Sequence, residues 1–199
     1  MLFRSGYGGS CFPKDVKAFI HTAAQLGFDA ELIKAVDEVN ARQKRVLFDK
    51  IRDYFADKEG LDGKTLAVWG IAFKANTDDV REAASLELIR AVTAEGMRVR
   101  AFDPVAGGNA EKVLSGNPLV EIVNEQYDAL KGADCLAVLT EWNQFRNPKF
   151  EILKRELKRA VIFDGRNLYS SDFVVSHGIE YFSIGRTPAT PKKRDQEFN

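Results

Sequence analysis

Cysteine is scarce in this sequence, which has Cys11 and Cys135 and no others among its 199 residues. Two cysteines cannot build the disulfide framework that stabilises small secreted domains. Met1 also opens no signal-peptide pattern. We therefore expect a cytoplasmic protein whose thiols are reduced.

The sequence also lacks an excess of charge of either sign, because Lys and Arg together number 29 and so do Asp and Glu. Without a net field, we expect no nucleic-acid partner and no binding to an anionic membrane. No apolar run approaches the ~20 residues that a transmembrane helix needs. A phosphate-containing ligand would have to be held by a few well-placed cations.

Histidine is as rare as cysteine. His21 and His177 have no Cys, His or acidic neighbours at the spacing of metal ligands, so we expect no metal site. What the sequence does contain is an ordinary globular composition, 45% hydrophobic and 29% charged. That composition suffices for one full core and an appended element.

Residues 1–27 predict a glycine-rich loop that leads into a helix. Pro13 suits the first helical turn, where its missing N–H is not needed, and Gly27 is a typical residue just past a helix end. Residues 28–60 follow as a second unit, in which residues 30–55 predict one long helix without Pro or Gly. An apolar stripe is expected along that helix, formed by Leu32, Val36, Val39, Val46, Ile51 and Phe55. A stripe of this length indicates a helix that bridges two domains or pairs with its copy in a dimer.

Residues 61–186 alternate apolar strands with helices. Strands are expected at residues 64–73, 98–103, 119–123, 133–140, 160–164 and 180–184, with helices at 83–95 and 148–158. Nearly continuous apolar strands between helices predict an α/β fold with a parallel, doubly wound, Rossmann-like sheet. Residues 187–199 are polar and contain proline, so we expect a disordered tail whose basic run, 192–194, is solvated.

The loop G-Y-G-G-S-C-F-P-K-D, residues 6–15, is the first candidate site. Cys11 immediately precedes the expected helix start, where the helix dipole favours a thiolate, and Asp15 follows four residues later. A nucleophilic thiol near a carboxylate fits chemistry that passes through a thioester and its hydrolysis. The alternative is that Asp15 caps the helix and Cys11 is a small buried residue.

The turn after the first strand of the sheet differs from a dinucleotide-binding turn. It offers Gly70 alone where a G-x-G-x-x-G fingerprint would stand, and Asp103 lies 33 positions later rather than about 20. This domain is therefore not expected to hold NAD in the usual way. Lys74, at the end of a strand, is positioned to pair with a diphosphate, and Arg81 is a second candidate cation.

Four further motifs occur in a fixed order along the chain. They are V-N-A-R-Q at 39–43, G-I-A-F-K-A-N-T-D-D-V-R-E at 70–82, T-E-W at 140–142 and D-G-R-N at 164–167. Together with the cysteine loop, they make the sequence resemble the UDP-glucose/GDP-mannose dehydrogenase family over nearly its whole length. The strings look more like the UDP-glucose branch, although they do not determine which base is bound.

The resemblance implies a four-electron oxidation of UDP-glucose to UDP-glucuronate that uses two NAD+ in turn. It implies that Cys11 is the nucleophile that carries the thioester, and that Asp15 positions or activates water. It also implies residue contacts: Gly6, Tyr7, Gly8 and Gly9 with the sugar, Phe73, Lys74 and Arg166 with the UDP part, and Cys11, Lys14 and Arg81 with NAD. A homodimer through the long helix is implied as well.

The sequence departs from the family in lacking the amino-terminal NAD-binding half. We therefore expect a truncated or split enzyme that does not turn over alone and needs that domain in cis or in trans. Two alternatives stay open: a relative that oxidises GDP-mannose, and a non-catalytic module for nucleotide-sugar binding and dimerisation. Other polar and aromatic residues are expected to be structural, namely Trp69, Asp78, Asp79, Cys135 and Trp142, and no role is assigned to Glu141.

Overall fold

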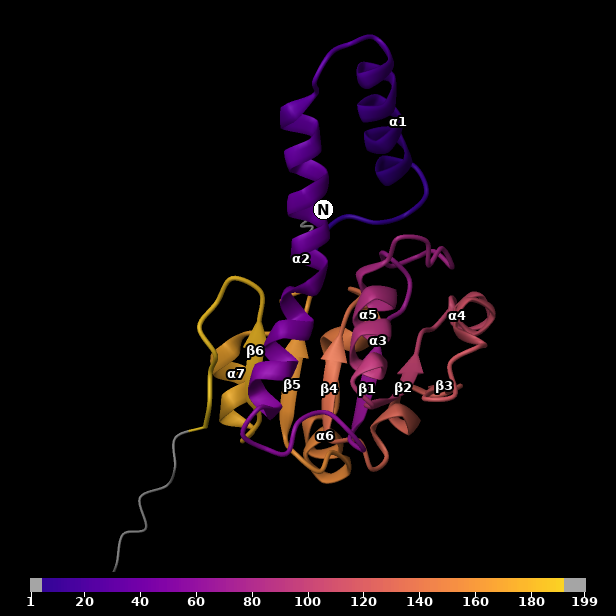
Figure 1. Cartoon of the computed structure of the whole chain (residues 1–199). Helices are drawn as coiled ribbons and strands as arrows, with labels where there is room; N and C mark the ends of the chain where they lie inside the picture. The colour runs from indigo at the N-terminus through magenta and orange to yellow at the C-terminus, as the bar shows by residue number, and fades with distance from the viewer. Residues whose placement is uncertain (1–4, 192–199) are drawn as a thin grey trace, which may run out of the picture.

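A computed structural model describes residues 5–191 as a parallel sheet with helices on both faces and a helical hairpin that projects beyond the carboxyl ends of the strands (Figure 1). The strand order is β3-β2-β1-β4-β5-β6, and every neighbouring pair is parallel. The predicted doubly wound α/β fold is thus confirmed.

The strands are β1 (Thr65–Trp69), β2 (Arg98–Phe102), β3 (Val120–Ile122), β4 (Cys135–Val138), β5 (Val161–Asp164) and β6 (Glu180–Ser183). The helices are α1 (Phe12–Gln25), α2 (Glu31–Phe55), α3 (Ala84–Ala94), α4 (Gly107–Leu114), the 3-10 helix η1 (Gln126–Leu130), α5 (Asn143–Arg146), α6 (Phe150–Glu156) and α7 (Ser171–Ser176).

The sheet separates two cores. Alternate residues of β1 point to opposite faces, as the pleat of a strand requires. Leu66 and Val68 belong to the core formed with α2, α3 and α4, whereas Ala67 and Trp69 belong to the core formed with η1, α5, α6 and α7. Because both faces are covered, the central strands β1 and β4 are buried at every position, which agrees with the nearly continuous apolar runs in the sequence.

Four short helices of the sheet domain were not predicted. These are α4, η1, α5 and α7, none longer than eight residues. Each spans about two turns or fewer, so its helical period is weak in the sequence. Each is nonetheless fixed by a buried apolar side chain, such as Leu114 in α4, Phe145 in α5 and Val174 in α7.

The long helix α2 has the predicted length, but its predicted single stripe is wrong. Ile51 and Phe55 are fully buried against the sheet, whereas Leu32 is 76% exposed and Val39 is 52% exposed. A helix turns by about 100° per residue, so Ile51 lies roughly 100° around the helix from Leu32. The carboxyl-terminal half of α2 therefore packs on the sheet, and the exposed stripe is confined to the amino-terminal half, which forms the hairpin with α1 (Figure 1).

Ala189 lies in the segment that was expected to be disordered, but it is ordered against the sheet. Ala189 forms an antiparallel bridge with Tyr181 of β6, and each backbone N–H donates to the other residue's carbonyl, at 2.8 and 2.9 Å. The basic run at 192–194 lies outside the described residues. Between residues 5 and 191, no helix is long and apolar enough to cross a membrane.

Candidate active site

The cysteine loop lies where the hairpin meets the sheet domain. Cys11 precedes α1 directly, its side chain is exposed, and its Sγ atom lies 3.8 Å from Ser10 Oγ. No side chain caps the start of α1, so the alternative of Asp15 as a helix cap and Cys11 as a buried residue is wrong. The Asp15 carboxylate lies 3.6 Å from Lys14 Nζ in an exposed pair. Cys11 and Asp15 are one helical turn apart, joined by the Asp15 N–H bond to the Cys11 carbonyl.

Two glycines allow this loop to contact the segment after β1. A Cβ atom at Gly8 would overlap the carbonyl of Glu82, and one at Gly9 would lie 2.8 Å from the ring of Phe73. Gly9 also has a φ of 86°, and its N–H donates to the carbonyl of Arg81 at 2.8 Å. Only glycine satisfies both the left-handed backbone and the close approach. The glycines thus bring the cysteine loop against the G-I-A-F-K motif.

The other end of the loop is held by α2. The Tyr7 N–H donates to Asn40 Oδ1 at 2.7 Å, and Asn40 Nδ2 donates to the Tyr7 carbonyl at 3.2 Å. The Tyr7 ring is buried against Phe12, with 4.5 Å between ring centroids, and a Cβ atom at Gly6 would lie 2.7 Å from Asn40 Oδ1. Asn40 is the second residue of V-N-A-R-Q, so this motif anchors the cysteine loop, a role that sequence reasoning missed.

The motifs after β1 and β4 interlock at the carboxyl edge of the sheet. Thr140 Oγ1 donates to the carbonyl of Ala72 at 2.6 Å, and a Cβ atom at Gly70 would overlap the Thr140 side chain. The sheet order reverses between β1 and β4, and ligands of doubly wound sheets bind at such a point. G-I-A-F-K and T-E-W therefore build the edge at which a nucleotide ligand is expected.

Asp103 occupies the end of β2, where a dinucleotide-binding domain has its ribose-binding carboxylate. Here the carboxylate is buried and accepts five N–H donors of the protein. These are the backbone amides of Ile71, Ala72, Val105 and Ala106 and the indole of Trp142, at 2.7 to 3.2 Å. Its lone pairs are thus committed to the turns after β1 and β2 and to Trp142, in agreement with the missing glycine fingerprint.

Arg166 is the most enclosed of the predicted site cations. Its side chain is 6% exposed, and its guanidinium donates to the carbonyls of Leu139 at 2.7 Å and Phe73 at 2.6 Å. Burial lowers the pKa of Arg166, and the negative charges of Glu141 and Asp164 oppose that shift. Glu141, whose carboxylate lies 3.2 Å from Arg166 Nε, is therefore its charge partner, which gives T-E-W a role that the sequence did not reveal.

Lys74 follows Phe73, the residue whose carbonyl accepts a hydrogen bond from Arg166. Its Nζ atom is 5.3 Å from the centroid of the Phe73 ring. Together with Asn76, Glu141 and Arg146, it lines a pocket of 450 Å³ at the carboxyl edge of β1 and β4. Because Glu141 is already paired, Lys74 gives this pocket a positive charge.

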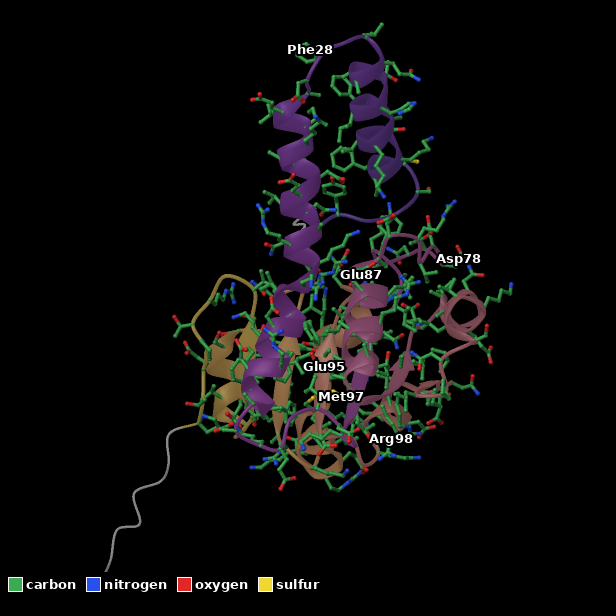
Figure 2. All side chains as sticks on the ribbon, viewed as in Figure 1. Phe28, Asp78, Glu87, Glu95, Met97 and Arg98 are labelled. Atoms are coloured by element: carbon green, nitrogen blue, oxygen red, sulfur yellow. The ribbon has the colours of Figure 1, made fainter. Side chains whose placement is uncertain are left out.

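A larger pocket of 610 Å³ lies between α1 and α3. It is lined by four cations, Lys14, Lys17, Arg81 and Arg90, together with Glu82 and Glu87. Figure 2 shows Glu87 near the end of α3 that faces the hairpin.

Arg81 is held in place by Asp79. Its Nε and NH2 nitrogens each donate to the Asp79 carboxylate at 2.9 Å, and this guanidinium holds the pKa of Asp79 below its ordinary value. Asp79 was expected to cap the next helix, but α3 begins at Ala84 without a side-chain cap.

The remaining sequence predictions concern Cys135 and metals. Cys135 is fully buried in β4, and burial raises the pKa of its thiol. This confirms its expected structural role. Over residues 5–191, no three His, Cys, Asp or Glu side chains gather in a way that could hold a metal ion.

Comparisons with known proteins agree with this arrangement. A model of the UDP binding domain of the UDP-glucose/GDP-mannose dehydrogenase family matches residues 67–171, and a model of that family's central domain matches residues 2–42. The UDP-glucose 6-dehydrogenase of Pseudomonas aeruginosa is 44% identical over 187 residues, which are 92% of this chain and 41% of that protein. The UDP-glucose 6-dehydrogenase YwqF of Bacillus subtilis is 39% identical over 186 residues, 94% of this chain and 41% of that protein.

A solved structure shares the fold. The UDP-glucose dehydrogenase of the archaeon Pyrobaculum islandicum aligns with a TM-score of 0.75 and 32% identity, over 92% of this chain and 38% of that one. This chain spans about 41% of the length of each of the two bacterial relatives named above. The first family model covers more than half of the chain. The chain belongs to the UDP-glucose/GDP-mannose dehydrogenase family.

Proposed function

We propose that this chain is the part of an NAD-dependent UDP-glucose 6-dehydrogenase that carries the catalytic cysteine and the nucleotide-sugar site. The observation that carries the proposal is the contact of Gly9 with Phe73, because it joins the cysteine loop to the nucleotide motif. The relatives named above support the choice of substrate, since both bear the name UDP-glucose 6-dehydrogenase.

The nucleotide-sugar would bind from the carboxyl edge of the sheet toward the cysteine loop. Lys74 would pair with the diphosphate as a point charge, and Phe73 would contact the UDP-sugar. Arg166, expected to contact UDP, would also hold the Phe73 and Leu139 carbonyls in position through its buried guanidinium. The backbone of residues 6–9 would line the sugar.

The chemistry proposed for this site oxidises the C6 alcohol in two stages. Loss of a hydride and a proton gives the aldehyde, and the Cys11 thiolate then adds to the carbonyl carbon. Loss of a second hydride from this adduct gives a thioester, which water hydrolyses to the uronic acid while the thiol is released. Asp15, one turn along α1, would position or activate that water.

The residues present fit part of a dinucleotide site. Lys14 and Arg81 line the 610 Å³ pocket beside the cysteine loop, where they would attract the negative charges of NAD. NAD+, when bound, would supply the acceptor for both hydrides. The relatives are more than twice as long as this chain, so the rest of the cofactor site would come from a further domain, in cis or in trans.

The exposed stripe of α2 would form a homodimer. Val36 and Val39 line an apolar groove of 410 Å³ together with Leu32, Ala35 and the cysteine-loop residues Gly6 and Tyr7. Closed two-fold pairing is the commonest way in which soluble proteins cover such a face. The dimer would therefore adjoin the proposed sugar site.

Calorimetry with the 199-residue chain tests the function. UDP-glucose and UDP should bind measurably and NAD+ should bind more weakly, because the dinucleotide fingerprint is missing from the sheet domain. Lys74→Met should weaken UDP binding by about tenfold through the lost phosphate contact. Lys112→Met, an exposed lysine of α4, is the control and should bind UDP like the parent chain.

Two outcomes would reject the proposal. NAD+ binding as tightly as UDP would mean that the sheet domain is a dinucleotide site after all. A clear preference for GDP over UDP would transfer the chain to the GDP-mannose branch of its family.

A further inference from the structure

Glu82 connects three parts of the molecule through one carboxylate. It belongs to the segment between β1 and α3. Its Oε1 atom lies 3.0 Å from Lys17 Nζ on α1, and its Oε2 atom lies 3.1 Å from Lys44 Nζ on α2. The Lys44 side chain is 7% exposed, so its charge depends on Glu82 for neutralisation in a place with little water.

The backbone at Glu82 makes a second set of contacts with the cysteine loop. Glu82 has a φ of 52°, in the left-handed region that residues with a Cβ atom rarely adopt. Such a conformation persists where the surroundings hold it. Its carbonyl fills the space beside Gly8, and the carbonyl of the preceding Arg81 accepts the Gly9 N–H.

These contacts bracket Cys11 in the sequence. The backbone of residues 81–82 holds Gly8 and Gly9, two to three positions before Cys11, whereas the Glu82 carboxylate holds Lys17, six positions after it. Glu82 also stands between two cavities, because it lines both the 610 Å³ pocket and a 270 Å³ pocket between α1 and α2.

The charge on Glu82 is well supported. Hydrogen bonds from Lys17 and Lys44 hold the pKa of Glu82 below its ordinary value, although burial opposes them. The carboxylate is therefore ionised at neutral pH, and both lysine contacts are charge-assisted hydrogen bonds.

We propose that Glu82 is a positioning residue, which fixes the segment that carries Cys11 against Phe73 on one side and against α2 on the other. Its importance for catalysis rests on the proposed function, in which Cys11 is the reacting thiol. The contacts themselves do not depend on that function. A neutral residue at this position would leave Lys44 buried without its charge partner and would release α1 from the segment after β1.

The test uses Glu82→Gln in the full 199-residue chain, with Glu87→Gln as the matched control. Glu87 lines the same two pockets, but its carboxylate lies 3.7 Å from Arg90 of its own helix. Hydrogen exchange at the Gly9 amide and the rate of Cys11 alkylation by iodoacetamide are measured. In Glu82→Gln, Gly9 should exchange about tenfold faster and Cys11 alkylation should change about threefold or more, because charge-assisted bonds that hold the loop are lost.

The amide of Val68 in β1 separates positioning from general stability. A purely structural role of Glu82 would accelerate exchange at Val68 and Gly9 together, whereas a positioning role accelerates Gly9 alone. Equal acceleration at both amides, unchanged Gly9 and Cys11, or the same changes in Glu87→Gln would overturn the proposal.

Two more variants cover the case in which Glu82→Gln does not fold. Lys17→Met removes one contact at a side chain that is 57% exposed and should shift Gly9 and Cys11 in the same direction by less. Glu82→Asp keeps the charge on a shorter side chain. Its Gly9 exchange and Cys11 alkylation rates should fall between those of the parent and of Glu82→Gln. If neither Lys17→Met nor Glu82→Asp shifts these rates, the proposal is contradicted. If UDP binding fails while Gly9 and Cys11 respond, the proposed function is wrong and the positioning role stands.

Discussion

Replacement of Asp103 with asparagine tests how the turns after β1 and β2 are held together. The side chain of Asp103 accepts N–H groups at both oxygens, two at Oδ1 and three at Oδ2. Asparagine has almost the same shape but offers one oxygen and one NH2 group. In either orientation, its NH2 group faces at least two N–H donors that have lost their acceptor.

The magnitude follows from these bonds. A buried hydrogen bond to a charged group contributes about 1.5–3 kcal/mol, so the loss of two gives about 3–6 kcal/mol. That is a large part of the ~5–15 kcal/mol by which a typical domain is stable. Asp134→Asn is the matched control, since Asp134 accepts one backbone N–H, from Thr65 at 2.9 Å, and a longer bond from Lys158 at 3.4 Å. Its carbonyl oxygen can keep the Thr65 bond, so a loss of about 1 kcal/mol is expected.

Urea unfolding followed by far-UV circular dichroism measures both variants. With a slope of about 2 kcal/mol per M, the midpoint for Asp103→Asn should fall by about 1.5–3 M at an unchanged slope. A loss below about 1 kcal/mol, or an equal loss in Asp134→Asn, would refute the reasoning that the five N–H donors depend on the Asp103 carboxylate.

Two further predictions concern the thiols and the assembly. Iodoacetamide should modify Cys11 about a hundredfold faster than Cys135 in the native chain, since the first is exposed and burial raises the pKa of the second; peptide mass spectrometry measures the rates, and equal rates would contradict this account. Sedimentation equilibrium should show a dimer at micromolar concentration that Val39→Asp splits, because burial of an unpaired charge costs several kcal/mol. A parent chain that stays monomeric across that range would exclude the dimer.

The sheet was predictable because its central strands form nearly continuous apolar runs. Residues 65–69 and 135–138 are buried at every position. The prediction of a single stripe along α2 was wrong for a physical reason. Residues spaced by three, four, five and seven positions do not stay on one face of a helix, because each spacing adds a different residual rotation. Leu32 and Ile51 therefore lie on different faces. The spacing of apolar residues does not indicate that α2 passes from the exposed hairpin to the sheet.

Motifs in the sequence nominated candidate site residues such as Cys11, Phe73 and Lys74, whereas the contacts that hold the candidate site together depend on distant partners. Asn40 binds a loop residue 33 positions away, and Glu82 binds Lys17 across 65 positions. Such pairs follow from the topology alone, so no local pattern indicates them.

The two edge strands of the sheet, β3 and β6, are the places where another chain could add a strand during folding. An exposed edge strand offers unpaired N–H and carbonyl groups to any extended segment nearby, which is a common route to aggregation. At one edge β3 is three residues long, too short to present much of a template. At the other edge, Ala189 already satisfies the Tyr181 backbone, and the flanking Pro188 and Pro191 have no N–H to donate to an incoming strand. Residues 188–191, which were expected to be disordered, thus leave less of this edge open to edge-to-edge association.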